Sequence, residues 1–555
     1  MPCAVAPLEA ERPRPRPSGR HVAQKSSRRR PPEPQTASAA LYALSQLGDE
    51  HALAQLAGLR NRVAFKPILK EIDKALDALA ARTGLSREDL EELSVPTFGM
   101  NEQGVRSDVL GNVTAELRVE GRDIALTWRN AAGKALKSPP AAVKRDFAEE
   151  LKELKAAQKD AAQALSTISA RLDGLFLAQK SWPLEVWRER YLEHPLVGTV
   201  TRRLIWVVDG QSVGVTDAGF EDMDGESQTF PDDAPVALWH PLEHEPEVTA
   251  WRAWLLARHV TQPFKQAHRE VYRLTGAEEQ TRVYSYRFAA HILKQHQFNA
   301  LCALRGWHNT LRLDVDHEAP PATLTLPVWG LRAEFWIESV VSEHGSETTE
   351  SGAFLYVSTD QVRFYPADAG ENSAHMAGGP YHLHYRSDAP VEPVPLNEVP
   401  PLVFSEVMRD VDLFVSVTSV ANDPLWFDRN DEHADYWQTA SFGELSTTAE
   451  TRKELLTELL PRLSLRDSCR LEGRFLVVQG VLRTYRIHLG STNILMEPGS
   501  EYLCIVPSRG SGWREGDVFL PFEGDTALSD ILSKAFMLAD DTAITDPLIV
   551  NQIKR

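Results

Sequence analysis

The hydrophobic pattern of this chain changes near residue 320, and this change limits the folds that the chain can adopt. Before it, between 141 and 305, apolar residues recur mostly at the three- and four-residue spacing of helices. From Thr323 onward, short apolar runs such as TLTLPVWGLRAEFWIESVV and LRTYRIHLG indicate strands. The pattern predicts a mixed α and β protein, with a central helix-rich α/β region and a C-terminal α+β domain with antiparallel strands.

The length of 555 residues exceeds one compact core and suggests roughly three or four domains. Residues 1–38 are rich in Pro, Arg and Ser and are predicted to be a disordered basic tail. Residues 39–104 contain short helical patterns that end at glycine, as at Gly48, and predict HEAT-like hairpins whose edge would dock a protein partner. The rest divides into a helix-rich α/β domain, 105–320, and an α+β domain, 321–555.

Composition points to a protein of the cytoplasm. We find no apolar run of 18 or more residues and no apolar core of a secretory signal, so no membrane association is expected. The cysteines stand far apart without a CxxC pair, which argues against a zinc ribbon or a disulfide framework; they are Cys3, Cys302, Cys469 and Cys504. A net charge of −18 argues against indiscriminate binding of nucleic acid.

One stretch, 262–309, contrasts with this acidic background. It holds seven Lys/Arg against three Glu, interleaved with seven aromatic residues and four His. If a helix begins at Gln262, then Lys265, Arg269 and Tyr272 share one face, with His268 beside them. Such a face would offer donors to a phosphate or carboxylate, with His268 as an acid or base.

The second half of this stretch predicts two more helices and an aromatic surface. Thr275 and Glu278 have the spacing of a capping box, and a further helix is expected over 286–305. A second group would stack on a base or nucleotide ring; it comprises Tyr284, Tyr286, Arg287 and His291. The competing interpretation is that these arginines and rings make structural ion pairs and packing at a domain junction.

Asp410 and Asp412 form a D-x-D that we place at the start of a strand, with Glu406 one turn upstream. Residues i and i+2 of a strand face the same way, so the two carboxylates would share a Mg²⁺ ion. A nucleotidyltransferase would also need a Gly-Ser or Gly-Gly turn about 10 residues earlier, and none is there. The alternative is that Asp410 is buried against Arg409 or another arginine.

Two further groups are candidates. Arg486 and His488 share a strand face before a small polar turn that contains Asn493, a pattern that suits an anion or ribose pocket but also an exposed sheet face. His375, His382 and His384 supply the residues of a three-His metal site. GxSxG, P-loop and GxGxxG motifs are absent from the sequence.

Several long blocks together resemble the bacterial MolR-like proteins. They include QPFKQAHREVY, YSYRFAAHI, TDQVRFY, VPPLVFSEVMRDVDLFV, LRTYRIHLGSTNILMEP and LPFEGDTALSDILSKAF, and the resemblance extends from about Ala39 to Arg555. These are large proteins named for a domain of unknown function, some with a WGR domain, whose signature this sequence lacks. The resemblance implies a regulatory role linked to molybdate but brings no established reaction or catalytic residues. Such relatives are longer at the N-terminus, so a short relative or an internal start codon is expected.

The sequence therefore predicts a cytoplasmic regulatory or ligand- or nucleic-acid-binding protein, with no cofactor identified. The ligand-binding candidates are Lys265, His268, Arg269, Arg287, Arg486, His488 and Asn493. One alternative is a metal-dependent enzyme that acts on nucleotides or nucleic acid through Asp410 and Asp412, with His268 as a further catalytic candidate. The other is a scaffold subunit. An open cleft around Asp410 and Asp412 would favour the enzyme, whereas buried pairs with arginine would count against it.

Overall fold

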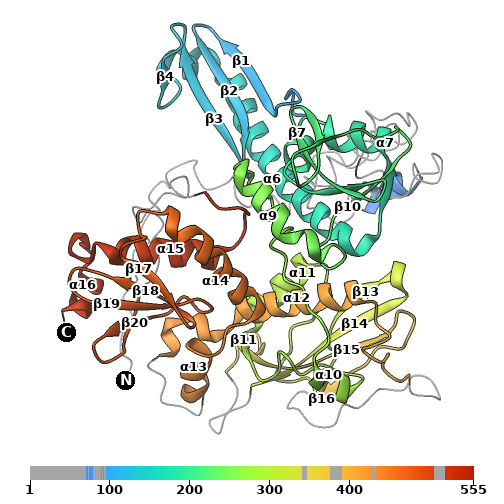
Figure 1. Ribbon diagram of the computed structural model, residues 1–555, viewed down its shortest axis with the longest axis vertical. Coiled ribbons are helices and arrows are strands. Elements are labelled where there is room, and N and C mark those ends of the chain that lie inside the picture. Colours follow the sequence, from blue (N-terminus) through green and yellow to red (C-terminus); the bar gives the residue numbers. More distant parts are fainter. Residues whose placement is uncertain are drawn as a thin grey trace, which may run out of the picture. The chain divides into compact units, whose positions relative to one another are not determined.

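The computed structural model (Figure 1) describes residues 70–72, 74–78, 89, 92, 95–340, 347–375, 391–427, 433–505 and 519–554. These residues fall into two compact units. The first comprises the described residues up to Leu165 together with Arg188–Thr199, and the second comprises Ser166–Trp187 and the described residues from Val200 onward. The predicted tail and most of the predicted helical leader lie outside the described residues, although 70–72 and 74–78 are helical.

An antiparallel sheet dominates the first unit. Its order is β1-β2-β3-β4, and its strands are β1 (Val105–Leu110), β2 (Val113–Glu120), β3 (Asp123–Asn130) and β4 (Ala135–Leu136). β2 and β3 form the hairpin that the alternating apolar residues predict, with Glu120 opposite Asp123. After Pro140 the helical chain is divided at Phe147 into α5 (Ala141–Asp146) and the long α6 (Ala148–Ala178), whose last part, from Ser166, belongs to the second unit.

The first sheet of the second unit packs against tryptophan side chains. Its order is β5-β10-β6-β7-β8-β9, with β5 (Ser181–Pro183), β6 (Trp206–Val208), β7 (Gln211–Thr216), β8 (Gly219–Glu221), β9 (Ser227–Gln228) and β10 (Pro235–Leu238). Gly214 in β7 lies under the Trp254 indole of α9 (Val248–Ala257), where a Cβ atom would come within 2.5 Å of the ring. After β5, the chain forms the short helix α7 (Leu184–Trp187) and a π-helical turn (Arg188–Leu192).

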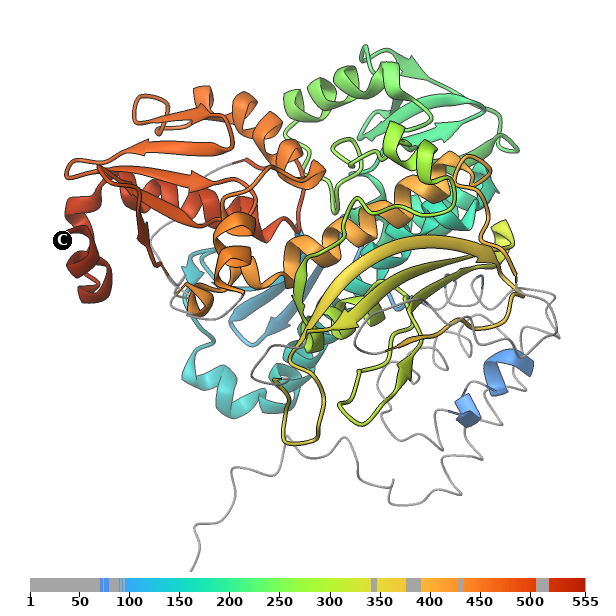
Figure 2. The ribbon, with the colours of Figure 1, turned by 90° about the horizontal axis from the view of Figure 1, so that it is seen from below.

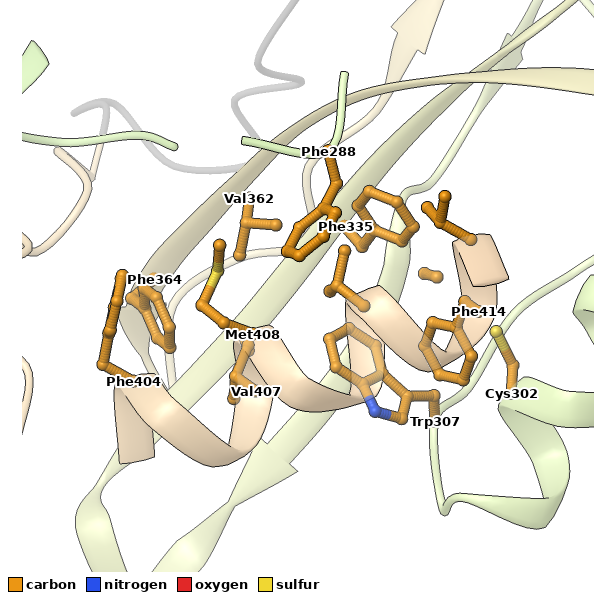
Figure 3. Packing of buried hydrophobic residues seen from close by; sticks show 14 of the residues in the cluster. Phe288, Cys302, Trp307, Phe335, Val362, Phe364, Phe404, Val407, Met408 and Phe414 are labelled. Carbon is orange, nitrogen blue, oxygen red and sulfur yellow. The ribbon is translucent and has the colours of Figure 1, made fainter. Parts of the chain in front are cut away.

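A second sheet, of order β11-β15-β14-β13, carries the largest core of this unit. Its elements are β11 (Ile292–Lys294), α11 (Gln295–Leu304), β13 (Ala322–Leu326), β14 (Leu331–Ser339), β15 (Tyr356–Pro366) and α12 (Pro401–Thr418). α12 lies along one face of the curved strands (Figure 2). Figure 3 shows Phe404 of this helix beside Phe364 of the sheet, and Met408 beside Val362. This core contains residues from both sides of position 320.

The C-terminal sheet is a meander of order β17-β18-β19-β20-β21 with its own core. Its strands are β17 (Cys469–Glu472), β18 (Phe475–Gln479), β19 (Thr484–His488), β20 (Ile494–Glu497) and β21 (Glu501–Leu503), and its helices are α14 (Thr447–Leu459), α15 (Thr526–Ala539) and α16 (Pro547–Ile553). The remaining elements are α8 (Val197–Thr201), α10 (Gly276–Thr281), α13 (Ala434–Ser441) and the two-stranded β12 (Glu318–Ala319) and β16 (Ala374–His375). Among the described helices, none has the length and hydropathy needed to cross a membrane.

Two predictions of secondary structure are wrong in ways that change the site. The run DLFVSVTSV is not a strand, because Val411, Phe414 and Val415 continue the buried helical stripe of α12 to Thr418. Residues 262–273 do not form a helix. There, the Gln266 side chain bonds to the backbone of Ile205, and tertiary contacts of this kind override helical spacing.

The rest of the basic stretch is partly as predicted. α10 has both hydrogen bonds of the predicted capping box, since Thr275 accepts from the Glu278 backbone and Glu278 accepts from the Thr275 backbone. The last helix begins only at Gln295, after strand β11, and Gly306 follows its end with φ +78°.

Candidate functional site

The first part of the basic stretch is buried, irregular chain that is held by its own polar groups. Gln262 pairs with the segment before α15, since its backbone N–H donates to Pro521 O at 2.8 Å and its carbonyl accepts from Glu523 at 2.9 Å. The Gln266 amide donates to Ile205 O and Trp239 O and accepts from the Ile205 backbone. These contacts place Lys265, His268 and Arg269 inside the second unit, and all three are buried.

Arg269 lies at the centre of a group of buried charges. Its guanidinium donates to Asp173 Oδ1 at 2.6 Å and to both carboxylate oxygens of Glu406, with Nε at 2.7 Å from Oε1. It also stacks over the Phe176 ring, 4.1 Å from the ring centre. Arg269 therefore joins the C-terminal part of α6 to the middle of α12 through two carboxylates.

Arg305 extends this group to Asp410. It donates to Asp173 Oδ2 at 2.5 Å and to Asp410 Oδ1 at 2.7 Å, while the Trp307 indole N–H donates to Asp410 Oδ2 at 2.9 Å. Both oxygens of Asp410 are thus occupied within the protein, and the partner is an arginine other than Arg409. This matches the structural alternative that the sequence left open for Asp410.

Lys265 belongs to a second chain of charges beside the first. Its ammonium lies 2.6 Å from Glu270 and 3.0 Å from Asp525. Arg409 of α12 pairs with Glu270 at 3.1 Å, and Arg452 of α14 pairs with Asp525 at 2.9 Å. Asp525 also caps α15 by accepting from Leu528, so this chain of charges ties three helices to the basic stretch.

Together these side chains form what we call the junction network. Its cations are Lys265, Arg269, Arg305, Arg409 and Arg452, and its anions are Asp173, Glu270, Glu406, Asp410 and Asp525. The five positive and five negative charges balance. A balanced, hydrogen-bonded set of this kind is the arrangement in which buried charges are tolerated.

In this network, burial raises the pKa of each carboxyl group, whereas a neighbouring cation lowers it. Burial raises the pKa of Glu406, but Arg269 opposes this effect and holds the pKa well below its usual range. At Glu270, burial is likewise outweighed by Lys265 and Arg409, and the pKa is about 2. Asp410 differs, because burial raises its pKa and Arg305 offsets only part of this effect. The charged form is thus favoured most strongly at the Arg269 end of the network.

His268 lies beside the network without a charge of its own. Burial, together with the nearby Arg252 and Lys265, lowers its pKa to about 3, and its Nδ1 atom has no hydrogen-bond partner among the described residues. The imidazole is therefore neutral at pH 7. A general base works best with a pKa near the working pH, so this environment is a poor one for acid–base catalysis.

Asp412 points away from Asp410. One oxygen accepts from the Tyr272 hydroxyl at 2.5 Å and from the Thr448 backbone and hydroxyl, and the other accepts from Ser416 at 2.8 Å. On a helix, residues i and i+2 are separated by about 200°. The prediction that the two carboxylates face the same way is therefore wrong, since it depended on a strand. The described residues contain no group of three or more His, Cys, Asp or Glu arranged to hold a metal ion.

The other candidates lie in separate places. Arg287 pairs with Glu278 at 2.5 Å. The rings of Tyr284 and Tyr286 pack edge to face, with their centres 4.7 Å apart. His291 lies 3.5 Å from the Tyr436 hydroxyl. Of the predicted histidine metal site, His382 and His384 lie outside the described residues.

The side chains in and next to the turn after β19 form hydrogen bonds with other parts of the chain. His488 donates from Nε2 to Gly443 O at 3.0 Å and accepts at Nδ1 from the Ser491 backbone, while burial lowers its pKa to about 4. Asn493 donates to Ala421 O at 2.9 Å. The Arg486 guanidinium instead lies over the Phe475 ring, 4.3 Å from the ring centre, and 3.5 Å from the Glu497 carboxylate. Within the described residues, these side chains fix the turn to the end of α13 and the segment after α12.

Sequence reasoning missed the carboxylates that complete the network. Asp173, Glu270 and Asp525 were not singled out, because charged residues on amphipathic helices usually face solvent. A signal was present in α12, where four charged residues interrupt a mostly apolar helix, namely Glu406, Arg409, Asp410 and Asp412. Charges among so many apolar neighbours indicate buried partners.

Comparison with known families gives two matches. Residues 133–307 match a domain of unknown function, DUF4132, and residues 449–553 match another domain of unknown function, DUF7737. Among curated proteins, the chain is similar to the uncharacterized protein YehI of Escherichia coli (strain K12), at 27% identity over 260 residues. This covers 43% of the chain and 21% of YehI, so the match spans about a fifth of that relative. No solved structure matches the chain.

Proposed function

We propose that this chain is a non-catalytic binding protein with a regulatory role, and that the basic stretch is its structural junction. One observation carries the junction assignment: Lys265, Arg269 and Arg287, the cations that this stretch offers to a ligand, are each paired with a carboxylate of the same chain. Removing one partner of a buried pair costs roughly 3–5 kcal/mol. A ligand would have to repay that cost before it gained affinity.

The regulatory part of the proposal rests on the resemblance to MolR-like proteins, and the cytoplasmic location rests on the scattered cysteines. A scaffold role through the predicted helical leader, 39–104, is a version of the same proposal in which the ligand is a protein. The metal-dependent enzyme fits the geometry less well, because Asp410 and Asp412 lie on different sides of α12 with internal partners.

The enzyme alternative gives the sharpest test. We expect the purified chain, incubated with Mg²⁺ or Mn²⁺ and either nucleoside triphosphates or single-stranded DNA, to yield no product above a heat-inactivated sample. The matched variants are Asp410→Asn and, as a control at an exposed pair, Glu472→Gln, whose side chain is 50% exposed. Turnover that Asp410→Asn abolishes and Glu472→Gln retains would overturn the proposal.

A nucleic acid is the second candidate ligand, and one observation favours it. Tyr286 is 50% exposed, it contacts Tyr284, and the Arg363 guanidinium lies 5.8 Å from the Tyr284 ring centre. Exposed rings beside arginine are typical of surfaces that stack single-stranded bases. We expect fluorescence anisotropy of labelled single-stranded DNA to show salt-sensitive binding that Tyr286→Ala weakens and Phe427→Ala, at a similarly exposed ring, does not. Equal binding by both variants would exclude this surface.

A further inference from the structure

The segment that carries the exposed Tyr286 ring is attached to β15 at two points. Ser285 exchanges two backbone hydrogen bonds with Val362, each 3.0 Å long. Further along, Ala290 N donates to Thr359 O at 2.8 Å. Tyr286 follows the first of these points, so it lies beside the two residues of β15 that separate Thr359 from Val362.

Those two residues, Asp360 and Gln361, interrupt the regular pairing of β15 with β14. Both oppose the single residue Trp336, because the register shifts between Phe335 and Ile337. An extra residue of this kind is a β-bulge, which changes the direction of a side chain. Gln361 Nε2 donates to Asp360 Oδ2 at 3.1 Å, so the two side chains lie on the same side of the strand.

A continuous set of contacts joins Asp360 to the ring of Tyr286. Gln361 Oε1 accepts from Arg363 Nε at 2.6 Å. The Arg363 guanidinium lies 5.8 Å from the centre of the Tyr284 ring, and the Tyr286 ring centre is 4.7 Å from that of Tyr284. These five side chains therefore share one face at the edge of the sheet, which we call the tyrosine face.

Asp360 offers a hydrogen-bond acceptor on this face. Within the described residues, its carboxylate accepts one hydrogen bond, from Gln361, and forms no ion pair. The side chain is half-buried, and its Oδ1 atom is not enclosed by protein. Burial raises the pKa of Asp360, and the opposing effects of Gln361 and Arg363 offset only part of the change. A further hydrogen-bond donor would therefore stabilise this carboxylate.

A ring beside an open carboxylate selects among the nucleic-acid bases. Bases of single strands stack on aromatic side chains and are recognised at their Watson–Crick edges. Guanine has two adjacent donors at that edge, N1–H and the 2-amino group. Adenine and cytosine have an acceptor beside their amino group, and thymine and uracil have one N–H between two carbonyls. Because an ionised carboxylate only accepts hydrogen bonds, it matches guanine and no other base.

We propose that the tyrosine face binds guanine in single-stranded nucleic acid, with the base stacked on Tyr286 and its N1–H and 2-amino group donating to the Asp360 carboxylate. A carboxylate has about four lone-pair sites, so Oδ2 can accept a second donor beside Gln361. The inference deepens the nucleic-acid candidate described above by naming the base, and it rests on that candidate.

The test is fluorescence anisotropy of the full chain with labelled oligothymidylates that carry one central guanine, adenine, cytosine or hypoxanthine. We expect the guanine probe to bind about tenfold more tightly than the adenine and cytosine probes, the discrimination typical of a good bidentate contact to a base. Hypoxanthine keeps N1–H but lacks the 2-amino group, so its probe should bind with intermediate affinity.

Two matched variants separate recognition of the base from a change in charge. Asp360→Asn should bind the four probes with similar affinity, because an amide cannot accept from both donors of guanine through a pair of equivalent oxygens. Asp368→Asn removes the same charge at an exposed position shortly after β15 and should retain the preference for guanine.

The outcomes distinguish the base preference from the nucleic-acid surface itself. Binding of no probe would overturn both. Equal binding of all probes by the unchanged chain would leave the surface in place and overturn the guanine preference alone, as would a preference that Asp360→Asn retains. If Asp360→Asn fails to fold, the unchanged chain decides: equal affinity for the guanine and hypoxanthine probes would then exclude the contact to the 2-amino group.

Discussion

Arg269 and Arg312 are both buried, with 3% and 2% of their surfaces exposed, yet their surroundings differ in kind. Arg269 meets the carboxylates of Asp173 and Glu406, whereas Arg312 meets one neutral carbonyl. The first arginine belongs to a network whose charges balance. The second leaves a donor unsatisfied and a charge unmatched. The role of a buried arginine therefore depends on its partners and cannot be inferred from its burial alone.

The difference lies in how each buried charge is compensated. In the junction network each charge is compensated by another part of the chain, so the network fixes how α6, α12, α14 and α15 meet. At Arg312, the free-energy cost of burying a charge is not offset by an opposite charge among the described residues. Strongly perturbed ionisable groups are enriched at functional sites, and structural ion-pair networks perturb them as well. Four substitutions test this contrast, and the largest effect is expected at Arg269.

Replacing Arg269 by Met should lower the free energy of unfolding by roughly 3–5 kcal/mol, because Asp173 and Glu406 would stay buried with less compensation. Urea denaturation followed by circular dichroism measures this change. Arg470→Gln, at an exposed ion pair, is the control and should change stability by less than about 0.5 kcal/mol. A loss at Arg269 no larger than that of the control would show that the network is not structural.

Asp410→Asn should have a smaller effect, a loss of about 1–3 kcal/mol. Arg305 would lose one carboxylate but keep Asp173, and an amide oxygen would still accept from Trp307 or Arg305. The same urea titration measures the loss. Because the network is shared, the double variant with Arg269→Met should lose less than the sum of the two single losses. Simple additivity would mean that the two ends of the network act independently.

The sequence predicted the local features of this comparison and missed the distant ones. The capping box at Thr275 and the strands within TLTLPVWGLRAEFWIESVV and LRTYRIHLG follow from short-range patterns, and the structure contains them. The bond from Arg269 to Glu406 spans 137 positions, and no local pattern encodes such a pairing.

The failures have the same origin. The helix expected at 262–273 is absent because Gln266 bonds to Ile205, which is 61 positions away. Asp410 and Asp412 do not share a face, because burial of apolar residues continues α12 through a run of β-branched residues that was expected to form a strand. Arg312 gave no signal at all, since the lack of a partner is visible only once every neighbour is in place.

The third prediction concerns His268, the buried and uncharged side chain beside the junction network. Its pKa of about 3 lies below the usual value of 6.5, so below pH 6.5 the unfolded chain binds a proton that the folded chain does not. Its contribution to stability is present above pH 6.5 and is lost as pH falls toward 3, at up to about 1.4 kcal/mol per pH unit. In His268→Gln the loss of stability between pH 7 and pH 5 should shrink by about 1–2 kcal/mol. Urea titrations at both pH values measure it, and an unchanged difference would show that the imidazole is not buried in its neutral form.

The smallest effect, and the one of opposite sign, is expected at Arg312. Met has a similar length and no charge, so Arg312→Met removes the buried unmatched cation at the expense of one hydrogen bond to Pro320 O. The free energy of unfolding should stay level or rise by about 1 kcal/mol, whereas the same change at Arg269 should lower it by roughly 3–5 kcal/mol. Parallel urea titrations of the two Arg→Met variants measure the contrast directly. Losses of equal size would mean that Arg312 is as well compensated as Arg269, and the distinction between a compensated and an uncompensated arginine in this chain would then fail.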